Sequence, residues 1–358
     1  MHLFLLACTA PSIDPGETAV SDTSSTIVQD GPAWPGDAWA EGAPEDHGLD
    51  PDALEELREY AFRDAHATQG VVVIKDGVLV AEWYADGTDA STPTTSWSAA
   101  KSVTSALIGA GIRDGLIELD QSVGDFVPEW SDGGNEVITV RNLLEMRSGL
   151  PENNTLQYGV YAAEDALAYS LDRELVREPG TEWSYVNEDS QVLGEVIHQA
   201  FGKPSVDVAQ EQIFGPIGMD AIWWTDGDNN ALTYCCMDST ARGMARFGLL
   251  YARGGEWDGQ QLIPADYVDL STSGVTYYGY YGLHWWVFDE DLFAAIGLHG
   301  QYVYVWPTED MVVVRMGEYT RSGTGYERTG NNYHQTVEPQ GWADEVFVPL
   351  FQGAVVED

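Results

Sequence analysis

Residues 98–113 read Ser98-Ala99-Ala100-Lys101-Ser102-Val103-Thr104-Ser105-Ala106-Leu107-Ile108-Gly109-Ala110-Gly111-Ile112-Arg113. Small side chains are frequent all round this stretch, and a helix of that kind lets neighbouring elements approach closely. The stretch therefore predicts one helix that is central and buried. Ser98 and Lys101 are three residues apart, so their side chains share one face of this helix.

Ser98 and Lys101 have the residue types of a nucleophile and its base. The start of a helix favours negative charge near Ser98. A buried lysine loses its proton more easily than an exposed one and can then accept the proton of a serine hydroxyl. The alternative for Lys101 is a lysine on the helix surface, which fits poorly with its small, apolar neighbours. The pair thus indicates attack on acyl substrates by a serine.

A second pattern follows at Trp183-Ser184-Tyr185-Val186-Asn187. A tyrosine hydroxyl that meets both Ser98 and Lys101 can relay a proton to a leaving group. Asn187 offers a hydrogen-bond donor and an acceptor to the acyl part of a substrate. By itself this pattern is common, and the alternative is an ordinary turn before a helix.

Further helices and strands flank these patterns. A helix is expected to begin near Asp50-Pro51, since Leu54 and Leu57 share one face. Asp76-Gly77 joins two apolar runs within residues 70–84 and predicts a hairpin. Other helices are expected at 142–147, 162–171, 191–201, 241–253 and 342–352, and strands at 292–297, 301–306 and 311–317.

Both ends of the chain therefore supply strands, and the middle supplies helices. This order predicts an α+β fold, an antiparallel sheet flanked by helices with a mainly helical region inserted. We expect one domain at 49–356, in which 49–92 and 245–356 form the α/β part and 93–244 the helical part. Residues 9–48 show little periodicity and predict an acidic, flexible linker.

The first eight residues resemble the signal of a bacterial lipoprotein. Leu5-Leu6-Ala7-Cys8 is similar to a lipobox, in which the cysteine becomes the lipidated N-terminus. The apolar segment is short, however, and no Lys or Arg precedes Arg58. A misplaced start codon or a chance cysteine is the alternative. We expect an exported bacterial protein, anchored at the membrane through Cys8 and facing the periplasm or the cell surface.

The order of the motifs resembles that of one superfamily. Ile138–Leu150 is similar to its element I-T-V/I-R-x-L-L-x-x-x-S-G-L, and Tyr185-Val186-Asn187 falls where it carries Tyr-x-Asn. Other elements of the superfamily are matched by Gly115–Asp120, Phe126–Trp130, Pro216–Met219 and Thr240–Gly248. From about residue 50 to 350 the chain thus resembles the penicillin-binding/class C β-lactamase superfamily. The resemblance implies a β-lactamase/transpeptidase-like fold.

The third motif of the superfamily differs in this chain. Residues 295–301, Ala-Ile-Gly-Leu-His-Gly-Gln, are similar to those of the nylon-oligomer (6-aminohexanoate-dimer) hydrolases and of related esterases. Most penicillin-recognising members have Lys-Thr/Ser-Gly on this edge strand, and alignment on Gly297 puts Ala295 where their lysine stands. The resemblance implies that the backbone N–H groups of Leu298 and Ser98 form the oxyanion hole.

Two side chains near this motif are ambiguous. His299 is either a substrate-facing side chain or a hydrogen-bonded turn residue. In the nylon-oligomer hydrolases a loop tyrosine also helps to bind the amide, and Tyr158 and Tyr161 are the candidates for that role here.

The resemblance implies a serine hydrolase that cleaves ester or amide bonds of small acyl substrates. Ser98, Lys101 and Tyr185 would be catalytic, while Asn187 and residues 297–299 would hold the substrate. No cofactor or metal is required. The alternatives are a β-lactamase or D-Ala-D-Ala carboxypeptidase and, in another class, a non-catalytic surface-binding lipoprotein on the same scaffold.

Composition argues against several other classes. With 16 Lys and Arg against 58 Asp and Glu, the formal net charge is −42, so nucleic acid and anionic lipid are repelled. The expected partner is a small ester or amide, and the membrane is reached only through Cys8. No G-x-S-x-G, H-E-x-x-H or glycine-rich phosphate loop occurs. Three cysteines exclude a disulfide framework, and Cys235-Cys236 favours two buried thiols over a vicinal disulfide.

Overall fold

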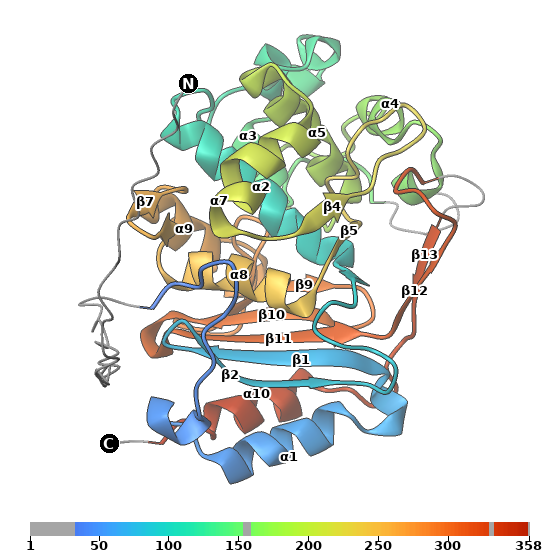
Figure 1. The fold of residues 1–358 in the computed structure, drawn as a ribbon. Helices are drawn as coiled ribbons and strands as arrows, with labels where there is room; N and C mark the ends of the chain where they lie inside the picture. The colour runs from blue at the N-terminus through green and yellow to red at the C-terminus, as the bar shows by residue number, and fades with distance from the viewer. Residues whose placement is uncertain (1–32, 153–158, 329–332, 357–358) are drawn as a thin grey trace, which may run out of the picture. The chain divides into compact units, whose positions relative to one another are not determined.

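A six-stranded antiparallel sheet, in the order β2-β1-β11-β10-β9-β8, is built from the two ends of the chain (Figure 1). The computed structural model describes residues 33–152, 159–328 and 333–356. The strands of the sheet are β1 (Thr68–Lys75), β2 (Val78–Tyr84), β8 (Trp286–Val287), β9 (Phe293–Gly297), β10 (Gln301–Trp306) and β11 (Met311–Gly317).

The neighbouring strands β1 and β11 are covered on both faces, which explains why they read as unbroken apolar runs. In β1, Val71 and Val73 face one hydrophobic layer, while Val72 and Ile74 face the other. The turn to β2 places Asp76 and Gly77 at φ +55° and +75°, as a two-residue hairpin turn requires. The predicted hairpin is therefore present.

Helices cover both faces of the sheet. On one face lie α1 (Pro51–Ala61) and α10 (Asp344–Gln352), and on the other lies α8 (Ala241–Ala252) (Figure 1). The Asp50 side chain accepts a hydrogen bond from the backbone N–H of Asp52 and so caps α1. Each layer thus buries one face of the same sheet.

The helical part lies beyond α8 and carries several small sheets. The helices outside the two layers named above are α2 (Ala100–Arg113), α3 (Val140–Leu144), α4 (Ala166–Leu171), α5 (Asn187–Phe201), α6 (Ser205–Ala209), α7 (Gly215–Ile217) and α9 (Ala265–Thr272). The remaining strands are β3 (Thr94–Thr95), β4 (Ala221–Trp223), β5 (Met237–Ser239), β6 (Glu256–Trp257), β7 (Gln260–Gln261), β12 (Tyr319–Ser322) and β13 (Tyr333–Thr336). Within the described residues, no helix has the length and apolar character that a membrane span needs.

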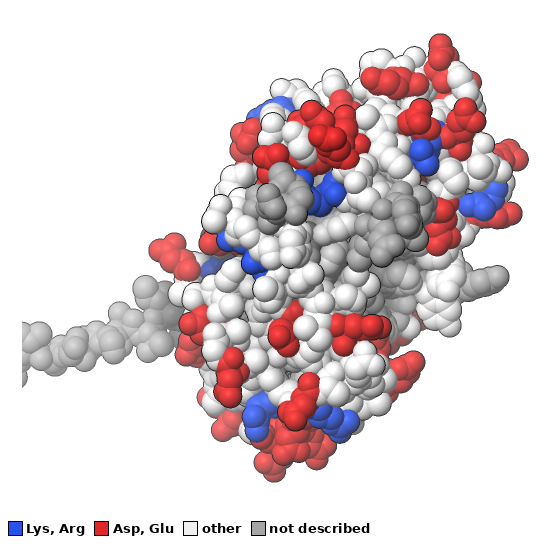
Figure 2. Space-filling model, turned by 90° about the vertical axis from the view of Figure 1, so that its right-hand side faces the viewer, with Lys and Arg blue, Asp and Glu red and all other residues white. Residues whose placement is uncertain are grey.

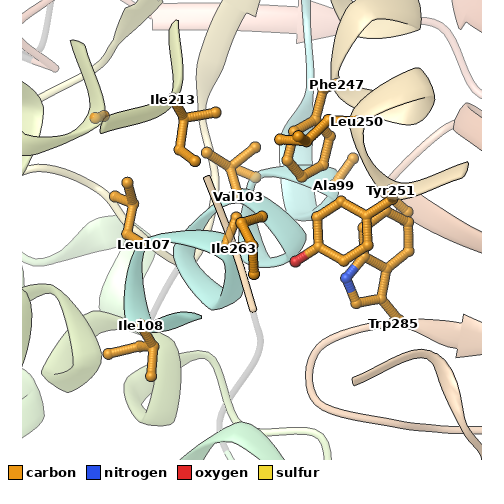
Figure 3. Close-up of a cluster of buried hydrophobic side chains, with 14 of the residues drawn as sticks. Ala99, Val103, Leu107, Ile108, Ile213, Phe247, Leu250, Tyr251, Ile263 and Trp285 are labelled. Carbon is orange, nitrogen blue, oxygen red and sulfur yellow. The ribbon is translucent and has the colours of Figure 1, made fainter. Parts of the chain in front are cut away.

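Helix α2 is as central as its small residues predict. Every residue from Ala100 to Gly111 is buried. Figure 3 shows Val103 and Leu107 of this helix surrounded by side chains that include Phe247 of α8 and Ile263. Because α2 is enclosed on all sides, the residues at its start are held by the whole core.

The folded domain begins earlier than residue 49, so the predicted linker is wrong over 33–48. The Trp39 side chain is buried, and the Gly42 N–H donates to the carbonyl of Leu79 in β2 at 3.1 Å. The buried Trp39 side chain holds this stretch against the domain, although its polar composition suggested a linker. Residues 1–32, including Cys8, lie outside the described part.

Candidate active site

Ser98 lies on a single 3-10 turn, η3 (Trp97–Ala99), that runs into α2. Trp97 has φ +43°, an unusual value for a bulky residue, and it turns the chain into the helix. Ser98 is only partly buried, whereas Lys101, one turn later, is 1% exposed. The serine can be reached from outside, while the lysine is closed off from water.

Three oxygen atoms surround the Lys101 amine. Nζ lies 3.2 Å from Ser98 Oγ, 2.7 Å from Asn187 Oδ1 and 2.6 Å from the backbone carbonyl of Tyr234. A neutral amine has two N–H donors and one lone pair, and a carbonyl or amide oxygen can only accept. With both donors used by Asn187 and Tyr234, the lone pair is directed at the Ser98 hydroxyl. This geometry is that of a base and its nucleophile.

Burial favours this neutral form. Loss of water lowers the pKa of Lys101 well below its ordinary value, while the carboxyls of Glu188 and Asp189 partly oppose that shift. Both acids are fully buried at the start of α5, and burial raises the pKa of each of them as well. Burial therefore shifts all three groups toward their uncharged forms.

Tyr185 completes the group. Its ring centroid lies 4.8 Å from Lys101 Nζ, and its hydroxyl is hydrogen-bonded to Ser98. Burial raises the pKa of Tyr185 to about 12, more than the Ser98 hydrogen bond lowers it. The hydroxyl consequently keeps its proton near neutral pH and can donate it. Ser98, Lys101, Tyr185 and Asn187, all predicted from sequence, lie together.

The end of β9 lies directly against the serine turn. A Cβ on Gly297 would be 2.1 Å from the carbonyl oxygen of Ser96, so only glycine allows this approach. Leu298 follows it and is 41% exposed, as a residue at the edge of a reaction site would be. Ala295 is fully buried, so position 295 presents no charged group to a substrate.

His299 is a hydrogen-bonded turn residue. Its backbone has φ +62°, and its Nδ1 lies 2.7 Å from Thr336 Oγ1, which in turn accepts a hydrogen bond from Trp97 Nε1. Through Thr336, His299 thus supports Trp97, the residue before Ser98.

In the parts of the chain that the structure describes, no three His, Cys, Asp or Glu side chains gather as a metal site would require.

Of the two candidate loop tyrosines, Tyr161 lies within the described residues. Tyr161 packs its ring against Trp97, with the ring centroids 5.6 Å apart. Tyr158 lies outside the described residues.

Sequence reasoning missed the segment 231–237, which spans the gap between α2 and α5. Thr104 Oγ1 donates to the carbonyl of Thr233, and Thr233 Oγ1 donates to the carbonyl of Ser190, each at 2.7 Å. The Tyr234 carbonyl binds Lys101, as described above. No short motif marks this segment, because it acts mostly through backbone groups.

Cys235 and Cys236 are joined by a disulfide, so the prediction of two free thiols is wrong. Cys236 has φ +71°, and this turn brings two neighbouring side chains to the same side of the chain. Left-handed backbone at a residue other than glycine is rare and cannot be anticipated from a Cys-Cys pair alone.

Aromatic side chains line the approach to Tyr185. The ring of Tyr185 stacks on Trp286, with centroids 6.0 Å apart, and Trp183 stacks on Tyr277 at 4.2 Å. Tyr281 contacts the rings of Tyr185, Trp183 and Trp286. Next to this group lies a hollow of about 430 Å³ that is lined by Tyr277, Tyr280, Trp286, Val287, Phe288, Ile296 and Asp344. Its walls are mainly apolar.

An antiparallel sheet with an inserted helical part and an accessible serine beside a buried lysine define a hydrolase of the β-lactamase/transpeptidase type. Residues 54–334 match the family Beta-lactamase. The chain therefore belongs to the Beta-lactamase family and is a serine hydrolase of that family.

Known relatives agree with this assignment. The chain is 22% identical over 287 residues to the 6-aminohexanoate-dimer hydrolase of Paenarthrobacter ureafaciens, covering 70% of this chain and 73% of that enzyme. It is 30% identical over 190 residues to the D-aminopeptidase of Brucella anthropi, covering 48% of this chain but 35% of the relative. The second match thus concerns about half of this chain and a third of its relative.

Solved structures show the same fold. A Bacillus anthracis protein described as a candidate 6-aminohexanoate-dimer hydrolase superposes with a TM-score of 0.67 at 24% identity, over 80% of this chain and 82% of that one. A penicillin-binding protein homologue from Caulobacter crescentus gives 0.63 at 19% identity, over 76% and 93%. The predicted α+β, β-lactamase/transpeptidase-like fold is confirmed.

Replacing Lys101 with arginine is expected to reduce the hydrolysis of p-nitrophenyl acetate by at least about a hundredfold, the usual size of a general-base contribution. Guanidinium does not release its proton near neutral pH. The exposed Lys203, which pairs with Glu211, supplies the matched control, and Lys203→Arg is expected to keep full activity.

The pH dependence tests the same base. Since the pKa of Lys101 is lowered, kcat/KM is expected to rise with pH along a limb whose midpoint lies below about 10.4, the ordinary value for lysine. An active Lys101→Arg enzyme with an unchanged limb would show that Lys101 is structural only.

Proposed function

We propose that the protein hydrolyses esters and linear amides of small acyl groups through an acyl-enzyme on Ser98. The observation that carries this proposal is the placement of Lys101 Nζ within hydrogen-bond distance of Ser98 Oγ and of two oxygens that can only accept. Both N–H groups of the neutral amine are taken by Asn187 and Tyr234, which leaves the lone pair for the Ser98 hydroxyl.

In the first step Ser98 Oγ attacks the substrate carbonyl carbon while its proton moves to Lys101 Nζ. A new C–O bond forms, and the carbonyl oxygen becomes negatively charged. We assign the stabilisation of that oxygen to the backbone N–H groups of Ser98 and Leu298, and the support is the close approach of the end of β9 to the serine turn. The positive end of α2 favours the same charge.

In the second step the tetrahedral intermediate collapses and the bond to the leaving group breaks. Tyr185 supplies the proton that the leaving group needs and recovers one from Lys101. Its raised pKa suits this role, since a neutral phenol is present at the start of each turnover. Water then attacks the acyl-enzyme with the same residues in reverse order and releases the acid.

The charge around the site favours uncharged substrates. Position 295 offers no cation to a substrate carboxylate, because Ala295 is small and buried. The net charge of −42 adds a field that repels anions, and Figure 2 shows acidic side chains far more widespread than basic ones on the face it draws. The aromatic walls beside Tyr185 favour apolar acyl or alkyl groups.

The names of the relatives support the amide part of the proposal. One is a 6-aminohexanoate-dimer hydrolase and another a D-aminopeptidase. We place short esters first, linear amides such as aminohexanoate oligomers second and β-lactams last.

Replacing Ser98 with alanine is expected to abolish turnover and covalent labelling by a fluorescent fluorophosphonate, with the circular dichroism spectrum unchanged. The exposed Ser91 gives a matched control, and Ser91→Ala is expected to label like the wild type. Peptide mapping of the labelled protein should find the probe on Ser98. Full activity of Ser98→Ala would end the proposal and leave the non-catalytic reading in its place.

Substrate choice is tested with one enzyme preparation on nitrocefin, p-nitrophenyl acetate and p-nitrophenyl butyrate. We expect kcat/KM for the esters to exceed that for nitrocefin at least tenfold, because the β-lactam carboxylate meets no cation at position 295. Nitrocefin turnover equal to that of the esters would make a β-lactamase the better description.

We also propose that Cys8 carries a lipid that tethers the domain to a membrane facing the periplasm or the cell surface. The support is the Leu-Leu-Ala-Cys sequence alone. In a bacterial host the full chain is expected to fractionate with membranes and to incorporate labelled palmitate. Cys8→Ser should appear in the soluble fraction without label, and membrane association of that variant would contradict the proposal.

A further inference from the structure

The segment 231–237 touches the catalytic group at two points, one on each side of its disulfide. Before the disulfide, the Tyr234 carbonyl accepts a hydrogen bond from Lys101 Nζ at 2.6 Å. After it, the Met237 carbonyl accepts from the N–H of Ser96 at 2.8 Å, and the Met237 N–H donates to Ser96 Oγ at 3.0 Å. Ser96 precedes the nucleophile by two residues.

The disulfide also packs against the serine turn. Cys235 and Cys236 are buried in one hydrophobic cluster with Trp97, the residue that directly precedes Ser98. Their backbone groups are held as well, since the Cys235 N–H donates to Leu232 and the Trp224 N–H donates to the Cys236 carbonyl. The pair is therefore enclosed by the same contacts that hold the nucleophile.

The bond constrains the segment at a position where the backbone is unfavourable. Cys236 has φ +71°, which an L-residue other than glycine adopts only when its surroundings impose it. A covalent link between the adjacent sulfurs closes a small ring around this turn. That ring contains the Cys235–Cys236 peptide bond, so it restricts the backbone between the Tyr234 carbonyl, which accepts from Lys101, and Met237, which pairs with Ser96.

We infer that the Cys235–Cys236 disulfide is a positioning element of the active site, which keeps the Lys101 lone pair directed at Ser98. The inference rests on the proposed function, since it assumes that Lys101 is the base. Tyr234 provides one of the two acceptors that orient the amine. Without the bond, the turn relaxes, the carbonyl moves away from Nζ and water enters beside Lys101.

Reduction is expected to have the same effect as removing the sulfurs. A dithiol such as dithiothreitol transfers two electrons and two protons, so the S–S bond breaks, two thiols form and the dithiol becomes its cyclic disulfide. Bonded sulfurs are about 2.0 Å apart, whereas non-bonded atoms of this kind need about 3.5–4.0 Å. In a fully buried cluster that increase requires the segment to shift.

The first test needs no enzymatic activity. The chain has three lysines, Lys75, Lys101 and Lys203, so a spectrum of protein labelled with ¹³Cε-lysine has three side-chain signals, and Lys101→Arg assigns one of them. We expect the Lys101 signal to titrate at higher pH after reduction and in Cys235→Ala/Cys236→Ala, because entering water stabilises the charged amine. An unchanged titration would overturn the inference.

The second test uses kinetics on a p-nitrophenyl ester. The double variant and the reduced wild type are expected to lose at least tenfold in kcat with KM nearly constant, and the rising limb of their pH profile should move to higher pH. The double variant itself should not respond to dithiothreitol. Alkylation and mass spectrometry of the 235–236 peptide, with and without reductant, report how much of the bond is present.

A matched control separates positioning from loss of packing. Val160 is buried in the same cluster but belongs to another segment, so Val160→Ala is expected to lower the melting temperature and leave the pH limb in place. If oxidised wild type neither hydrolyses esters nor reacts with fluorophosphonate, the proposed function fails, and the lysine titration still decides the disulfide's effect. Wild-type kinetics in a folded double variant would reject the inference alone.

Discussion

The structure depends on how one buried lysine amine is held. Burial lowers the pKa of Lys101 well below its ordinary value, but burial alone does not orient a flexible side chain. Orientation comes from two acceptors on different elements, Asn187 at the start of α5 and Tyr234 in the segment 231–237. The central position of α2 follows from this requirement, because only an enclosed helix can offer Lys101 acceptors from two sides.

The sheet supplies the other half of the site. Its strands come from both ends of the chain, so the layer with α1 and α10 closes the fold on one face while α8 and α2 occupy the other. This arrangement brings the end of β9 against the serine turn, where Gly297 allows contact with Ser96. Long-range packing thus sets the distance between the nucleophile and the backbone groups that follow Gly297.

Local patterns predicted the central helix, the first hairpin and the side chains that lie together around Lys101. The small residues of 98–113, the Asp76-Gly77 turn and the Tyr185-Val186-Asn187 pattern each carry their signal within a few neighbouring positions. The segment 231–237 has no such signal, since it acts through carbonyls that any sequence provides. Glu188 and Asp189 resemble ordinary acids at a helix start, and only the tertiary structure reveals their burial. Residues 33–48 were predicted as a linker from their polar composition, whereas the side chains of Trp34 and Trp39 pack in or against the core.

A neutral amine beside an acyl ester is a hazard as well as a base, because the amine is itself a nucleophile. If Lys101 attacked the acyl carbon on Ser98, the acyl group would pass from oxygen to nitrogen and remain there as a stable amide. Under the proposed mechanism, the hydrogen bonds from Nζ to Asn187 and Tyr234 limit how far the amine can turn from Ser98 Oγ toward the acyl carbon. The contacts that are proposed to activate the serine would therefore also oppose inactivation of the enzyme by its own intermediate.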